Sequence, residues 1–296
     1  MKAHGFTVAI PLYNKRAYVL EAVQSAVQQE PDEVIVVDDG STDGGAELVE
    51  SLGLARVRLV RQQNAGVAAA RNAALALATS TWVAFLDADD RYQPGHLAAL
   101  RDLAERFPSA GMLATGYCRV WIDGRRESIA LPGPARLLHD FYGQWSRLTF
   151  TCADSIAVNV AVSRRSGISF PLGETLGEDQ DVWFRMAEAA PVAYVGETRV
   201  DYRMEVAGSA TAQEPRPPTL LPCYLRLNER LQRGDVPSAM RAGARRLLGS
   251  HWLNTARAMR ERGDLAQGWA LWRSPQARGH KLYWLRTGLR WMAGLK

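Results

Sequence analysis

The sequence has no hydrophobic run long enough to span a membrane, since none of its apolar stretches reaches about eighteen residues. Its polar start, Met1–His4, precedes a predicted strand and lacks the apolar region of a signal peptide. Cysteine is scarce, and Cys118, Cys152 and Cys223 follow no metal-ligand spacing, which favours reduced and mostly buried thiols. We therefore expect a cytoplasmic protein, with peripheral attachment to the inner face of a membrane as a further option.

Acidic residues are rare near the C-terminus, and this asymmetry is more informative than the net charge of +5. From Pro215 onward there are 16 Lys and Arg residues but only 4 Asp and Glu residues, which gives about +12 there and about −7 for the preceding chain. The excess of positive charge is thus confined to the tail. We do not expect nucleic-acid binding, because the polar ends of the predicted strands are acidic and would repel phosphate without a metal.

The first half of the chain alternates between short apolar runs and segments with helical spacing. The apolar runs predict buried strands at Phe6–Ile10, Glu33–Val37, Val57–Val60 and Trp82–Leu86. Helices are predicted over Arg16–Gln29, Ala46–Leu52, from just after Gly66 to Ala78, and from Pro94 to Phe107. These repeated units predict an α/β fold with a mostly parallel central sheet and helices on both faces.

The second half is less regular. It predicts strands at 111–122, 156–162, 192–195 and 198–203, a loop with a short helix over 132–150, and a helix over Asp179–Ala190. Ala212–Pro218 has the composition of a linker, and helices are predicted at Leu220–Leu231, Pro237–Arg262 and Leu265–Trp272. We therefore predict a sheet-containing domain over residues 1–212 and a basic helical region over residues 213–296.

Polar residues gather where the predicted strands end, which is where open parallel sheets bind ligands. The four strand ends carry Pro11-Leu12-Tyr13-Asn14, Asp38–Asp43, Gln63–Gly66 and Asp87–Asp90. Asp87-Ala88-Asp89 places two hard oxygen ligands directly after a buried strand, an arrangement that suits Mg²⁺ or Mn²⁺ shared with phosphate oxygens. Turn and capping roles remain open for both acidic segments.

Five motifs, in order and at suitable spacing over roughly residues 5–210, resemble the family 2 inverting glycosyltransferases of the GT-A fold. They are Ile10–Asn14, Val34–Asp43, Asn64–Asn72, Phe85–Asp90 and Gly177–Trp183. The resemblance implies a Rossmann-like GT-A domain, a nucleotide diphosphate-sugar donor and a glycan or glycolipid acceptor. By analogy, the acceptor is a growing surface polysaccharide or lipopolysaccharide core, and the enzyme would take part in its synthesis.

The resemblance also implies roles for individual residues. Around the nucleotide and substrate it places Pro11, Leu12, Tyr13, Asn14, Asp39, Gly66, Arg71, Asp87, Ala88, Glu178 and Arg203. Asp39 would accept a hydrogen bond from a base N–H, which favours uracil. Asp89 is the expected direct ligand of Mn²⁺ or Mg²⁺, and Asp87 would support the ribose or the metal.

Asp179 matches the catalytic base of the family. An acceptor hydroxyl has a pKa far above neutrality, so a carboxylate must remove its proton during attack on the anomeric carbon. Asp181 is a rival carboxylate, although it should point elsewhere if Asp179 opens a helix. Helix capping is the plain structural reading of Glu178 and Asp179.

One departure from the family pattern is Glu205, which stands where many members have a histidine near the diphosphate. Two other functions stay open. A nucleotidyltransferase would need a glycine-rich loop that Ile10–Lys15 lacks, and a non-catalytic sugar-nucleotide-binding module would tolerate loss of the metal pair or the base, which are both intact.

The end of the chain predicts an imperfectly amphipathic helix over 281–296. One side carries Leu282, Leu285, Leu289 and Met292, and Trp284 and Trp291 fall outside it. Contact with a membrane surface and packing against the catalytic domain explain this pattern about equally well.

Overall fold

The computed structural model describes residues 4–206, 209 and 218–293. The chain divides into two compact units: a sheet unit of residues 1–138 and 150–212, and a helical unit of residues 139–149 and 213–296. The predicted boundary between residues 212 and 213 lies outside the described residues. The sequence did not indicate that residues 139–149 would group with the C-terminal helices.

The sheet unit contains one mixed sheet in the order β3-β2-β1-β4-β9-β6-β10-β5, with β7 paired to β6 and β8 to β10. The strands are β1 (Phe6–Leu12), β2 (Glu33–Asp38), β3 (Val57–Arg61), β4 (Trp82–Phe85), β5 (Arg91–Tyr92), β6 (Met112–Val120), β7 (Arg126–Ile129), β8 (Arg136–Leu138), β9 (Ile156–Asn159) and β10 (Val192–Arg203). Strands β3, β2, β1 and β4 are parallel, as predicted. Beyond β4 the sheet is mixed, because β9 runs antiparallel to both β4 and β6.

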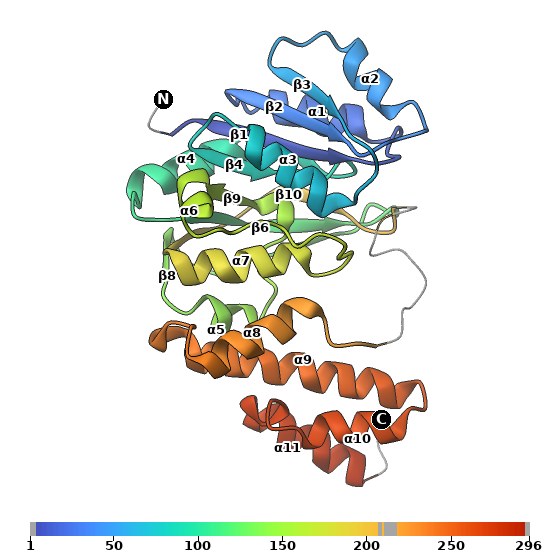
Figure 1. Cartoon of the computed structure of the whole chain (residues 1–296), viewed down its shortest axis with the longest axis vertical. Coiled ribbons are helices and arrows are strands. Elements are labelled where there is room, and N and C mark those ends of the chain that lie inside the picture. Colours follow the sequence, from blue (N-terminus) through green and yellow to red (C-terminus); the bar gives the residue numbers. More distant parts are fainter. Residues whose placement is uncertain (1–3, 207–208, 210–217, 294–296) are drawn as a thin grey trace. The chain divides into compact units, whose positions relative to one another are not determined.

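Helices cover the sheet, and their buried side chains share the core with those of the strands. They are α1 (Val19–Val27), α2 (Gly45–Ser51), α3 (Val67–Leu77), α4 (His96–Arg106), α6 (Val160–Arg165) and α7 (Glu178–Ala189). Figure 1 shows α3 and α7 in front of the sheet. Phe85 of β4 packs against Phe170 and Trp183, with ring centroids 5.3 and 5.5 Å away, so α7 is fixed next to the end of β4.

Two predicted strands differ from the structure. The run over 156–162 is a strand only to Asn159, whose side chain then accepts hydrogen bonds from the amides of Ala161 and Val162 and begins α6. β-branched residues suit strands, so the composition concealed this helix. The runs at 192–195 and 198–203 form a single strand, β10, with irregular pairing to β6 after Val195.

The helical unit consists of α5 (Phe141–Trp145), α8 (Pro222–Arg233), α9 (Arg241–Glu261), α10 (Leu265–Arg273) and α11 (Lys281–Met292). Helix α9 contacts each of the others. A Cβ atom on Gly243 of α9 would lie 2.0 Å from Asp140 Oδ1, so glycine is required where α9 approaches the start of α5. Within the described residues, no helix has both the length and the apolar character needed to cross a membrane.

Candidate active site

Hydrogen bonds join the chain segments at the carboxyl ends of β1 and β2. The Asp39 amide donates to the carbonyl of Leu12 at 2.8 Å, and Asn14 Oδ1 accepts from the Thr42 amide at 2.8 Å. Tyr13 between them is 49% exposed, whereas Leu12 is fully buried. Of the predicted segment Pro11–Asn14, Tyr13 and Asn14 are therefore exposed to solvent, and Leu12 belongs to the core.

Asp39 organises the loop that leads into α3. Its carboxylate is buried and accepts hydrogen bonds from Gln62 Nε2 at 2.7 Å and from the amides of Ala65 and Gly66 at 2.8 Å. A carboxylate has about four acceptor positions, so one remains for a ligand donor. Gly66 has φ +91°, a conformation that disfavours other residues, and the space in front of its Cα is open.

Arg71 of α3 connects the end of β4 to the start of α7. Its guanidinium is buried and binds Asp87 Oδ1 at 2.7 Å and Glu178 Oε1 at 2.9 Å. Burial acts to lower the pKa of Arg71, but the charges of Asp87 and Glu178 raise it above its ordinary value. The structure thus brings together three predicted residues from distant parts of the sequence.

Asp179 lies in the first turn of α7, after Gly177 at φ +78°. Its side chain is partly exposed, and its Oδ1 accepts from the Gln180 amide at 2.7 Å. Burial raises the pKa of Asp179, against the opposing charge of Arg71. Asp181 is buried and pairs with Arg185, one turn further along α7, at 2.8 Å.

Glu178 is the more buried of the two carboxylates that open α7. Burial raises its pKa to about 7, the charge of Asp179 adds to this, and Arg71 opposes it. The approach to α7 is held by Asn72 of α3, which exchanges two 2.8 Å hydrogen bonds with the backbone of Phe170. Helix α3 therefore positions both the helix start and the loop before it.

The loop after β4 separates its two predicted metal ligands. Asp89 forms an ion pair with Lys15 at 2.8 Å, whereas Asp87 binds Arg71. Arg203 of β10 supports this loop, because its Nη1 donates to the Asp89 carbonyl at 2.7 Å and its amide donates to Asp90 Oδ1 at 2.6 Å. Ala88 is buried at the centre of the loop.

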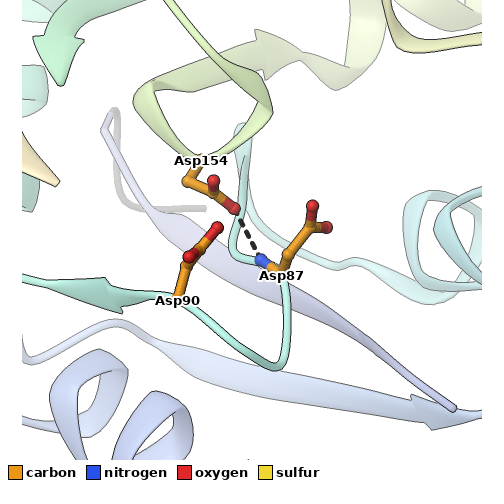
Figure 2. Close-up of side chains that lie close together, drawn as sticks. All are labelled: Asp87, Asp90 and Asp154. Atoms are coloured by element: carbon orange, nitrogen blue, oxygen red, sulfur yellow. Dashed lines mark hydrogen bonds between the residues drawn. The ribbon is translucent and has the colours of Figure 1, made fainter. Parts of the chain in front are cut away.

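Asp87, Asp90 and Asp154 form an acidic cluster whose ligand atoms lie within 4.8 Å of one another. Figure 2 shows the Asp90 and Asp154 carboxyl groups facing each other, with the Asp87 carboxylate turned outward. Asp154 Oδ1 accepts from the Asp87 amide at 2.6 Å. No local signal in the sequence indicates Asp154, which is a single aspartate in a one-turn 3-10 helix (Ala153–Ser155).

The chemistry of this cluster fits a divalent metal. Burial and then the charge of Asp87 raise the pKa of Asp154 to about 7, and burial and then the charge of Asp154 raise that of Asp90. A cation among these three hard oxygen donors would offset the crowding of like charge. The cluster includes Asp87 of the two predicted ligands, whereas Asp89 pairs with Lys15 instead.

Comparison with known proteins gives a consistent family. Residues 7–165 match the model described as glycosyl transferase family 2. TuaG of Bacillus subtilis, a glycosyltransferase named for teichuronic acid biosynthesis, is 30% identical over 205 residues, which cover 67% of this chain and 78% of TuaG. The succinoglycan biosynthesis protein ExoO of Rhizobium meliloti is 38% identical over 113 residues, which cover 37% of this chain but only 32% of ExoO.

A solved structure shows the same fold. Residues 1–349 of S. aureus TarS, in complex with UDP-GlcNAc, superpose with a TM-score of 0.71 at 18% identity, covering 98% of this chain and 92% of that fragment. The match to another structure of S. aureus TarS covers 96% of this chain and 54% of the TarS chain. At this identity the likeness establishes the fold alone.

Proposed function

The chain belongs to glycosyl transferase family 2 and is a glycosyltransferase, and from this premise we propose that it moves a sugar from a UDP-sugar to an acceptor hydroxyl with inversion at the anomeric carbon. The observation that carries the proposal is the Arg71 network, which joins Asp87 at the end of β4 to Glu178, the neighbour of Asp179 at the start of α7. The UDP-GlcNAc complex of TarS supports a uridine donor.

In this proposal Asp179 is the general base. It takes the proton of the acceptor hydroxyl while that oxygen bonds to the anomeric carbon, and the bond to the diphosphate oxygen breaks with its electron pair leaving on UDP. Attack from the face opposite the leaving group inverts the centre. The raised pKa of Asp179 makes its carboxylate a stronger base than an exposed aspartate.

The other predicted residues bind and orient the donor. Exposed Tyr13 lies beside the joined ends of β1 and β2, where it offers a flat surface for a base. The unused acceptor position of Asp39 suits the imide N–H of uracil. The Gly66 turn leaves room for the nucleotide to approach the backbone.

Asp87, Asp90 and Asp154 would hold Mn²⁺ or Mg²⁺ in this proposal. When bound, such an ion neutralises charge on the departing diphosphate. Arg71 and Glu178 keep Asp87 in place, and Arg203 orients Asp90 through its backbone amide. In the same loop, the side chain of Asp89 is held by its ion pair with Lys15.

The acceptor is proposed to be a growing surface polysaccharide. The names of TuaG and ExoO, which refer to teichuronic acid and succinoglycan biosynthesis, support this class. This class includes a glycan carried on a lipid.

Calorimetry and nucleotide-release assays test the reaction. The purified protein is titrated with UDP, GDP, dTDP and CMP in the presence of Mn²⁺ or EDTA, and UDP release is then followed with UDP-sugars and candidate acceptors. Asp179→Asn should retain UDP binding and lose about 10²- to 10⁴-fold in turnover. Asp181→Asn is the matched control because its carboxylate binds Arg185 outside the site. Normal turnover in Asp179→Asn, or preference for another nucleotide, would contradict the proposal.

A further inference from the structure

Helix α11 has an inner face that is fixed within the helical unit. The indole of Trp272 in α10 donates to the carbonyl of Trp284 at 3.1 Å, and the Trp284 indole donates back to the carbonyl of Trp272 at 2.9 Å. The two rings stack with centroids 4.7 Å apart. These reciprocal contacts fix the rotation of α11 about its axis.

Gly288 and Trp291 also pack closely on the inner face of α11. A Cβ atom on Gly288 would lie 2.4 Å from a ring carbon of Trp272, so only glycine permits this approach. Trp291 is buried, with its ring 5.0 Å from that of Trp269 and beneath the guanidinium of Arg260. The tryptophans that the sequence placed outside the apolar stripe therefore form the packed side.

The opposite face of α11 is apolar and exposed. Leu282, Leu285, Leu289 and Met292 are 67%, 51%, 63% and 70% exposed. At about 100° per residue, these positions fall within an arc of roughly 80°. A continuous stripe of four large apolar side chains is unlike the scattered apolar residues of an ordinary protein surface, and it indicates an interaction site.

The surroundings of the stripe are basic. Lys281, Arg286 and Arg290 are exposed on its two sides. After Asp264 the sequence contains six Lys and Arg residues and no acidic residue. A second copy that brought the same face against this one would oppose cations with cations, so the charge pattern disfavours self-association.

We propose that this outer face of α11 docks in the plane of an anionic lipid surface. The apolar stripe would enter the boundary between headgroups and acyl chains, and the flanking cations would meet lipid phosphates. Twelve residues span about 18 Å, which is too short to cross a bilayer but suits a helix that lies along it. This inference is independent of the proposed glycosyl transfer.

Vesicle co-sedimentation of the full chain, without donor or metal, tests the inference. Vesicles of phosphatidylcholine with one quarter phosphatidylglycerol should pellet the protein, and pure phosphatidylcholine or high salt should reduce pelleting. Leu289→Glu should weaken partitioning by about tenfold or more, because an inserted leucine is replaced by a charge. Equal pelleting of this variant and the wild type would overturn the proposal, as would failure of the wild type to bind anionic vesicles.

Two further variants separate the contributions. Ile122→Glu places the same charge at a 91% exposed position of the sheet unit and should bind like the wild type. Arg286→Gln should weaken binding about fivefold. Analytical ultracentrifugation tests whether a second copy of the chain binds this face instead. A dimer that Leu289→Glu abolishes, together with no binding to vesicles, would overturn the lipid proposal in favour of a second copy. Because these assays contain no sugar donor, their outcome is separate from that of the transfer assay.

Discussion

Replacing Arg71 by methionine should strongly destabilise the sheet unit. Methionine approximates the length of the arginine side chain but leaves Asp87 and Glu178 without their common partner. Removing one member of a buried ion pair costs about 3–5 kcal/mol, because the remaining charge stays buried and uncompensated. For a unit of roughly 200 residues, where 1 kcal/mol shifts the melting temperature by about 2–4 °C, we expect a decrease of roughly 6–20 °C.

The pH dependence of this effect follows from Glu178. Its pKa in the folded protein is about 7 with Arg71 present, above the ordinary value of 4.5, so folding favours the protonated form between these values. Without Arg71 the folded pKa rises further, and the penalty for ionised Glu178 extends to higher pH. Arg71→Met should therefore be more destabilising at pH 8 than at pH 6.

A double-mutant cycle isolates the pair. Glu178→Gln alone should have a small effect because the amide oxygen still accepts from Arg71. The free energy of unfolding lost in the double variant should be smaller than the sum of the two single losses by about 1–3 kcal/mol, since no ionised Glu178 remains.

Differential scanning calorimetry at pH 6 and pH 8 provides the measurement. Arg61→Met serves as the control, because Arg61 pairs with Glu47 and Glu50 on the exposed surface, where water screens the interaction, and little change is expected. The reasoning would be refuted if Arg71→Met lowered the melting temperature by less than about 2 °C. It would also be refuted if the stability losses of the two single variants added strictly in the double variant.

Two more predictions concern Asp154 and His251. Asp154→Asn keeps an acceptor for the Asp87 amide but removes a charge from the acidic cluster. Calorimetric titration with MnCl₂ should therefore show an affinity for Mn²⁺ that is lower by about tenfold to a hundredfold. Unchanged affinity would exclude Asp154 from the metal site. His251 stacks on Tyr224 and accepts from the Leu221 amide at 3.1 Å, and burial lowers its pKa to about 4. Because the unfolded chain binds a proton below about pH 6.5 and the folded chain does not, stability is retained above pH 6.5 and is lost by up to about 3 kcal/mol as the pH falls to 4. His251→Gln should flatten this dependence between pH 7.5 and pH 5 in thermal denaturation, and an unaltered dependence would assign it to other groups.

The sequence by itself determined the family, three parallel strand pairings among β1 to β4 and a helix from about residue 179, which begins at Glu178 in the structure. These features are local or repeat in a fixed order: apolar periodicity identifies buried strands, and polar residues directly after them mark the binding edge of the sheet. The same local logic separated Asp179 from Asp181, because two residues along a helix turn the side chain by about 200°. In the structure Asp181 is paired to Arg185.

Only the tertiary structure decided which distant residues meet. Asp154 joins the acidic cluster because β9 enters the sheet antiparallel between β4 and β6, and no spacing within the sequence encodes that pairing. Lys15 pairs with Asp89 for a similar reason, across 74 residues of chain. The orientation of α11 was likewise ambiguous until the Trp272 and Trp284 contacts fixed its inner face and left the leucine stripe exposed. Hydrophobic periodicity assigns residues to faces of a helix, but packing partners decide which face is buried.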